Sequence, residues 1–179
     1  MTTEHRAAAA PPERADAHTI HGVAIRAGET TRIRDVFGEE FDEQFARGAF
    51  EPEDDMMLLV GHDQRGIPLA RRANGTLVVD AKPTALTYEA RLRPGATADD
   101  LLAAIERRDV GGSSIGFEVL DQVWDAKATP PLRTITRARI VEVSLVAQPA
   151  YAGATVGRRD LGCPDPANPT LERIRSILS

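Results

Sequence analysis

Short runs in which hydrophobic and polar residues alternate make up most of the chain, and this pattern predicts β-strands. Within 114–119, Ile115 and Phe117 fall on one face and Ser114 and Gly116 on the other, because successive side chains of a strand point to opposite sides. The predicted strands cover 18–25, 56–60, 84–92, 114–119, 132–137 and 138–147.

One well-formed helix is predicted just before the strand that contains Ser114. Thr97 can cap its first N–H groups, and Leu101, Leu102 and Ile105 form an apolar stripe at helical spacing. Arg107 would lie at the negative end of the helix dipole. The helix is therefore expected to lead directly into the serine strand.

Two shorter patterns predict local structure. Phe41 and Phe45 have the i, i+4 spacing of one helical turn and are expected to be core residues. Asn74-Gly75 lies between extended stretches in 69–80 and predicts a β-hairpin, because both residues accept positive φ.

These elements predict an α+β, mainly β fold, built as an antiparallel β-barrel with a few short helices. A chain of 179 residues fits a single domain. We expect a flexible Ala- and Pro-rich leader at 1–17, the folded domain at 18–157 and a polar tail at 158–179. The tail is interpreted either as a frayed end or as a short amphipathic helix within 170–178 that docks a partner or is self-cleaved.

Composition and charge exclude several functions. A formal net charge of −5 with scattered basic residues argues against a nucleic-acid groove. The chain has no apolar run long enough for a membrane span and no secretory signal, so we expect it in the cytoplasm. Its single cysteine, Cys163, cannot form an internal disulfide, and the absence of CxxC and HExxH spacings predicts no metal site and no cofactor.

A histidine and a serine pair form the candidate chemistry. Ser113 and Ser114 follow two glycines, and a serine becomes a nucleophile only where a base takes its proton. His18, His21 and His62 are the candidate bases, and His62 has the best context because it ends an apolar strand. His5 is set aside because the leader is not expected to pack.

Structural explanations compete with this hypothesis. A lone histidine after a strand is more often a loop or core-edge residue. Gly-Gly-Ser-Ser is also typical of a helix stop followed by a strand start. Local sequence therefore leaves both interpretations open.

Four short motifs occur in a fixed order: GAF at 48–50, GHD at 61–63, SIGF at 114–117, and EVSLV at 142–146 followed by PA at 149–150. Their order and spacing over roughly residues 19 to 158 resemble the HK97-type prohead proteases of tailed bacteriophages, which are distantly similar to herpesvirus assembly proteases. The resemblance implies a serine endopeptidase that removes the scaffolding segment of the major capsid protein inside the assembling procapsid. It also implies that His62 is the base and Ser114 the nucleophile.

The third catalytic group has three candidates. Glu142 lies in an otherwise apolar strand, where an inward-facing carboxylate needs a partner, although it could equally share a solvated face with Ser144. His21 is a rival candidate, because the similar herpesvirus enzymes use a second histidine as the third catalytic group. Asp63 is a weaker candidate. Oxyanion donors could come from the backbone at 111–114, or from Arg137 or Arg139, and the sequence does not choose among them.

Some features depart from the family pattern. Val60 and Gly61 replace the aromatic residue and glutamine that many members carry before the histidine. Val23 replaces the tyrosine of the Gly-Tyr-Ala stretch near the start of the family pattern. These differences bear on substrate preference. The expected partners are the major capsid protein and possibly a second copy of the chain, and the alternative function is a non-enzymatic capsid-assembly or scaffolding module on the same fold.

Overall fold

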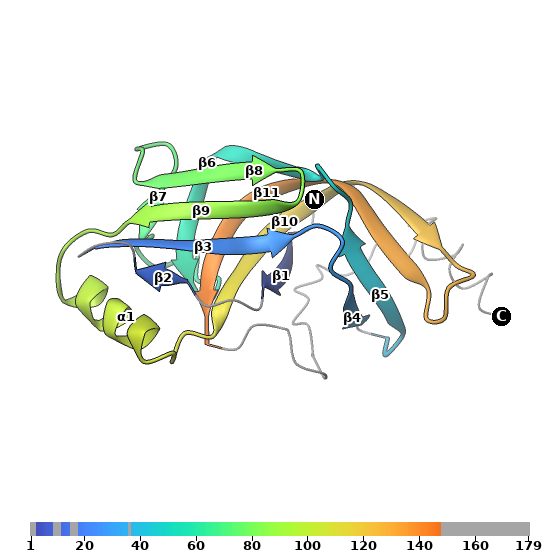
Figure 1. The fold of residues 1–179 in the computed structure, drawn as a ribbon, viewed down its shortest axis with the longest axis horizontal. Helices are drawn as coiled ribbons and strands as arrows, with labels where there is room; N and C mark the ends of the chain where they lie inside the picture. The colour runs from blue at the N-terminus through green and yellow to red at the C-terminus, as the bar shows by residue number, and fades with distance from the viewer. Residues whose placement is uncertain (1–2, 9–11, 15–17, 36, 148–179) are drawn as a thin grey trace.

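A computed structural model describes residues 3–8, 12–14, 18–35 and 37–147, which form two β-sheets and one helix (Figure 1). The larger sheet has the order β1 (Glu4–Ala8), β10 (Gly112–Asp125), β11 (Leu132–Val146), β5 (Glu40–Phe45) and β4 (Thr31–Arg34), with β6 (Phe50–Val60) pairing with β11 and with β7 (Ala70–Arg71). The smaller sheet has the order β2 (Glu13–Arg14), β3 (Thr19–Arg26), β9 (Ala85–Arg91) and β8 (Leu77–Lys82). Helix α1 (Ala96–Glu106) leads from β9 to β10.

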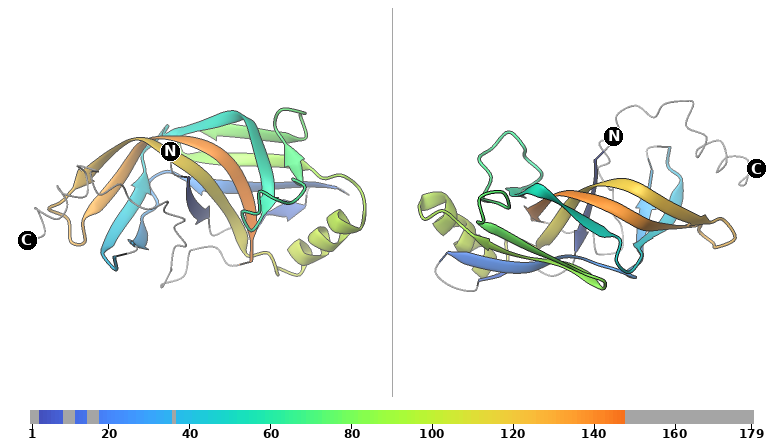
Figure 2. Two further views of the ribbon diagram at one scale, coloured as in Figure 1. Left: turned by 180° about the vertical axis from the view of Figure 1, so that it is seen from behind. Right: turned by 90° about the horizontal axis from the view of Figure 1, so that it is seen from above.

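The hydrophobic core lies between the two sheets, which are stacked in the right-hand view of Figure 2. Ile20 and Leu86 of the smaller sheet and Ile115, Phe117 and Val143 of the larger one belong to one cluster of fully buried residues. Their removal from water supplies the main stabilisation, at about 1.5–3 kcal/mol for each large apolar side chain. One face of β10 and β11 is thereby committed to the core, and the other is left for the polar residues of the same strands.

The prediction of a mainly β fold is confirmed, but the antiparallel barrel is not found among the described residues. Strand β11 runs parallel to both β5 and β6, and the strands form two separate sheets rather than one closed barrel. Alternation of apolar and polar residues is common to parallel and antiparallel strands, so the sequence pattern could not distinguish them.

Three local predictions were wrong in detail. Residues 40–45 form a strand rather than a helical turn; Phe41 and Phe45 are buried as expected, because i and i+4 share a face in a strand too. Gly75 does lie in a turn with positive φ, but β7 and β8 on either side belong to different sheets and do not form a hairpin. Helix α1 has Gly95 at its N-cap without a side-chain cap, so Thr97 lies in its first turn.

The expectation that His5 lies in a segment that does not pack is also wrong. Residues 4–8 form β1, which pairs antiparallel with β10, and residues 13–14 form β2.

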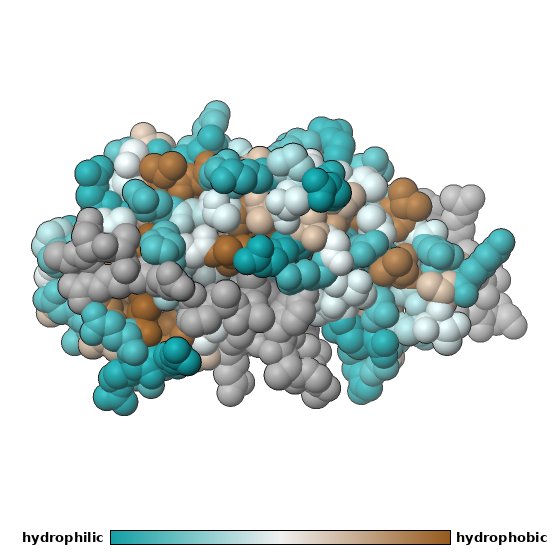
Figure 3. Space-filling model, viewed as in Figure 1, coloured by the Kyte–Doolittle hydropathy of each residue, from teal (hydrophilic) through white to brown (hydrophobic). Residues whose placement is uncertain are grey.

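Cys163 and the amphipathic helix expected within 170–178 lie outside the described residues, and the division into leader, domain and tail stays a prediction. The surface in Figure 3 mixes hydrophilic residues with small hydrophobic patches. Within the described part of the chain, no helix has the length and hydrophobicity needed to cross a lipid bilayer.

Candidate active site

Ser114 and Glu142 lie on the same face of neighbouring strands. In the antiparallel pairing of β10 with β11, Ser114 is opposite Ser144 and Gly116 is opposite Glu142. Directly opposed residues place their side chains on one face of a sheet. Ser113 points to the other face, where its hydroxyl is 2.7 Å from the Tyr88 hydroxyl of the smaller sheet. The structure thus separates the two adjacent serines.

His62 is brought to this face by a tight turn after β6. Gly61 and His62 both have positive φ, and the Asp63 N–H donates to the Val60 carbonyl at 3.1 Å, as in a hairpin-type turn. Positive φ is uncommon for a residue other than glycine and costs of order 1 kcal/mol. The backbone N–H of His62 donates to Ser144 Oγ at 3.0 Å, which fixes the turn against β11.

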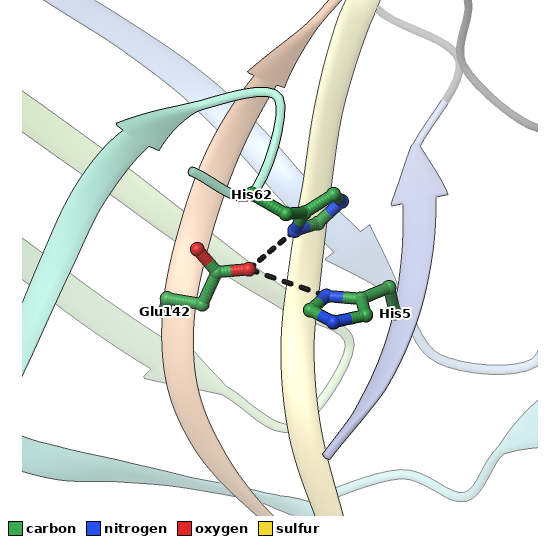
Figure 4. A group of neighbouring side chains, drawn as sticks. All are labelled: His5, His62 and Glu142. Atoms are coloured by element: carbon green, nitrogen blue, oxygen red, sulfur yellow. Dashed lines mark hydrogen bonds and ion pairs between the residues drawn. The ribbon is translucent and has the colours of Figure 1, made fainter. Parts of the chain in front are cut away.

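The Glu142 carboxylate is the centre of the hydrogen-bond network. The His62 ring donates through Nδ1 to Glu142 Oε1 (Figure 4). Ser144 Oγ donates to Oε2 at 3.0 Å. His5 Nδ1, from β1, lies 3.3 Å from the same Oε1. Burial opposes ionisation of this carboxyl, but its contacts with His5, His62 and Ser144 outweigh the effect of burial and lower its pKa from 4.5 to about 2. Glu142 is therefore negatively charged at neutral pH.

The low pKa of Glu142 predicts a pH-dependent stability. A carboxyl whose pKa is lower in the folded state stabilises the fold above its ordinary pKa, and this contribution is lost as the pH falls through the folded value. We expect urea denaturation to show a loss of about 3 kcal/mol between about pH 5 and pH 2 that the Glu142→Gln variant does not show. Parallel pH dependence of the two proteins would contradict the assignment.

Gly116 provides the space for the carboxylate. A Cβ at this position would lie 2.6 Å from Glu142 Cγ and 2.8 Å from Oε1. A side chain of any size at 116 would therefore push the carboxylate away from the His62 ring.

The Ser114 hydroxyl lies on the same face but does not bond to His62. Ser114 is 3% exposed, and its Oγ donates to the backbone carbonyl of Arg6 in β1 at 2.9 Å. Among the described residues no hydrogen bond joins Ser114 to His62; the two are linked through Ser144, which is opposite Ser114 and accepts the His62 N–H. Since Nδ1 is bound to Glu142, Nε2 is the ring nitrogen left to accept a proton.

A paired carboxylate and imidazole beside a serine is an arrangement that serine peptidases use. The model of the family described as Caudovirus prohead serine protease matches residues 5–162 of this chain. The chain belongs to this family. Neither the search of curated proteins nor the search of solved structures found a match.

Membership of the Caudovirus prohead serine protease family confirms the family expected from the four motifs. It implies a serine peptidase with a role in capsid maturation. The match begins at residue 5, so it includes His5, whose side chain contacts Glu142, and the rest of β1 after Glu4.

The rival candidates lie elsewhere in this prohead protease. His21 is exposed on β3 of the smaller sheet, and His18 lies 3.6 Å from Asp99 of α1. Asp63 is exposed and accepts the Arg65 N–H at 2.9 Å. Of the acids proposed from the sequence, Glu142 is the one whose carboxylate contacts the His62 ring.

The expected oxyanion donors are engaged in other contacts. Arg137 donates to Glu51 at 2.7 Å and Arg139 donates to Glu118 at 2.9 Å. The Gly111 N–H donates to the Val146 carbonyl at 2.9 Å. Residues 112–114 belong to β10, which pairs with β11 and, at 113 and 114, with β1, so their N–H groups also lie within paired strands.

His5 is the site residue that the sequence analysis missed. Its ring packs on His62 with centroids 3.9 Å apart. Residues 4–6 are Glu-His-Arg, with no apolar alternation, so the segment carries no strand signal of its own. The signal that could have pointed to His5 is the carboxylate of Glu142 in an otherwise apolar strand, because such a carboxylate needs partners and histidine can be one.

The same three side chains could hold a metal ion. One donor atom each from His5, His62 and Glu142 lies within 4.8 Å of the others, and two imidazoles with one carboxylate are a known zinc ligand set. The sequence spacing predicted no such cluster, because its members come from three separate strands or turns. In the prohead protease the hydrogen bonds to Glu142 already satisfy this carboxylate.

Substitution of Gly116 tests whether the position of Glu142 matters. Gly116→Ala would displace the carboxylate, and we expect peptidase activity to fall about 100-fold, as for a misplacement of about 1 Å in an active site. Gly66→Ala is the matched control, because its new Cβ would lie 3.4 Å from the nearest atom, Asp63 Oδ2. Equal activities of the two variants in a peptide-cleavage assay would contradict this role of Gly116.

Proposed function

We propose that this chain is a serine endopeptidase that cleaves the scaffolding segment of a phage major capsid protein during prohead maturation. In this proposal Ser114 is the nucleophile, His62 the general base and Glu142 the residue that orients and stabilises the imidazole. The observation that carries the proposal is the bond from His62 Nδ1 to the buried Glu142, on the face of β10 and β11 that also presents Ser114.

The reaction follows from the charges of these groups. Ser114 Oγ turns from the Arg6 carbonyl and gives its proton to His62 Nε2 as the oxygen attacks the carbonyl carbon of the substrate. The imidazolium gives this proton to the leaving amine as the peptide bond breaks, and an acyl-enzyme remains. Water then attacks the ester, losing a proton to His62, which returns it to Ser114. Glu142 stays ionised throughout, because its pKa is about 2, and it stabilises the imidazolium.

Location and partners follow from the same proposal. The enzyme would act in the host cytoplasm, within the assembling procapsid, where the scaffolding segments of the capsid protein are its substrate. The surface bears scattered charges of both signs, and the formal net charge is −5, which fits a protein partner rather than DNA.

Co-expression with the major capsid protein of the same phage tests the function. The wild-type chain should shorten the capsid protein, as seen by gel and intact mass, and His62→Ala should leave it at full length. His21→Ala, on the smaller sheet, is the matched control and should retain cleavage. Capsid particles that assemble with full-length chains in the presence of the wild-type protein would favour the non-enzymatic scaffolding module instead.

A further inference from the structure

Strand β1 pairs with the part of β10 that carries Ser114. It forms the edge of the larger sheet next to β10, with Arg6 opposite Ile115 and Ala7 opposite Ser114 (Figures 1 and 2). The backbone carbonyl that accepts the Ser114 hydroxyl is that of Arg6, at 2.9 Å. Extended peptides commonly bind proteins by adding a strand to a sheet edge in this way.

The Arg6 side chain is buried on the opposite face of β10. It is 8% exposed, although arginine is seldom fully buried without a charged partner. Its Nε donates to the buried carboxylate of Glu43 in β5, and its guanidinium carbon lies 5.6 Å from the centroid of the Phe117 ring. A buried carboxylate beside an aromatic face is a site suited to a basic side chain.

Two further charged side chains, Arg133 and Glu4, belong to the same network of ion pairs. Arg133 of β11 donates to Glu43 at 2.8 Å and to Glu4 of β1 at 3.0 and 3.1 Å. Glu4 also accepts from Arg6 at 3.1 Å, so the signs alternate around the four side chains. Strand β1 therefore supplies one acidic and one basic group, two residues apart, and β5 and β11 supply their partners.

We propose that the outer edge of β10 is the substrate cleft and that β1 occupies it as a substrate-like segment. In this inference, which rests on the proposed function, Glu43 selects a basic side chain on the carbonyl side of the bond that is cleaved. Arg133 selects an acidic residue two positions earlier, so the preferred peptide has the pattern Glu-x-Arg. The β1 segment competes with the capsid protein for this cleft and has to leave before cleavage.

A binding experiment in the absence of catalysis tests the inference. The probe is a fluorescein-labelled peptide of residues 3–10, Thr-Glu-His-Arg-Ala-Ala-Ala-Ala, added to full-length Ser114→Ala protein and followed by fluorescence anisotropy. Adding Arg6→Ala to the protein removes the anchor of the competing segment, and we expect the peptide to bind about 10-fold more tightly or better. Arg34→Ala is the matched control, because Arg34 pairs with Glu40 at the surface of β4 and β5 and should change nothing.

Substitution within the peptide keeps the test independent of whether each protein variant folds. Replacing the peptide arginine or the peptide glutamate by glutamine should weaken binding by about 10-fold or more, because each change removes one of the two charged partners of a buried side chain, Glu43 or Arg133. Equal binding of all peptides, or no gain from Arg6→Ala, would overturn the inference. If the peptides bind as expected but capsid chains stay at full length on co-expression, the proposed function is overturned. The assignment of the β10 edge as a peptide-binding site would then still hold.

Discussion

Replacing Ser114 with alanine is expected to abolish peptide cleavage, with a loss of about a million-fold in kcat, as for removal of the nucleophile in other serine peptidases. The hydroxyl lies on the polar face of β10, with Glu142 and Ser144 opposite on β11. Its loss removes the atom that forms the acyl-enzyme, while a methyl group fits the same space. Hydrolysis of a labelled capsid-derived peptide and the melting temperature together measure the effect.

Ser113→Ala is the matched control for this substitution. The Ser113 hydroxyl faces the smaller sheet and bonds to Tyr88, whose pKa is raised by burial to about 12. Its loss leaves the buried Tyr88 hydroxyl without that partner and should cost about 1–3 kcal/mol of stability. Activity below the melting temperature should remain. Loss of activity in Ser113→Ala with retention in Ser114→Ala would reverse the assignment of the nucleophile.

Glu142→Gln should give the second-largest loss, about ten-thousand-fold in kcat, by analogy with an amide in place of the triad carboxylate. The amide cannot stabilise the imidazolium, and it can donate to His62 Nδ1, which places the ring proton on Nε2 where the base is needed. The KM should change little, because Glu142 is buried behind the imidazole rather than exposed to substrate.

Glu51→Gln is the control for Glu142→Gln. Glu51 is exposed and pairs with Arg137 at the surface, so the same change of charge should leave kcat within about twofold, since exposed ion pairs contribute little. A large effect of Glu51→Gln, or wild-type kcat in Glu142→Gln, would show that the carboxylate of Glu142 does not support catalysis.

The sequence allowed the strands that carry Ser114 and Glu142 to be predicted, because each alternates between apolar and polar residues. It also put His62 at the end of an apolar strand, as the structure does. Their catalytic roles remain a prediction. The pairing of Glu142 with His62 could not be derived from periodicity, because the alternation of β11 fits a solvated face as well as a buried one.

The arrangement around these residues depended on long-range pairing, which local patterns do not encode. Strand β11 has parallel partners far away in sequence, so the expected antiparallel barrel did not follow from its alternation. The first residues of β1 are polar and carry no strand pattern. The strand is held by its pairing with the edge of β10 and by two ion pairs, Arg6 with Glu43 and Glu4 with Arg133. The sequence therefore allowed the strands of Ser114 and Glu142 to be predicted, but not the pairing of β1 with β10 beside them.

Covalent labelling with a serine-directed fluorophosphonate tests most directly whether the histidine and glutamate activate Ser114. We expect one adduct per wild-type chain, mapped to Ser114 by peptide mass analysis, with no adduct in His62→Ala and slow labelling in Glu142→Gln. A wild-type protein that stays unlabelled, or an adduct on another serine, would contradict it.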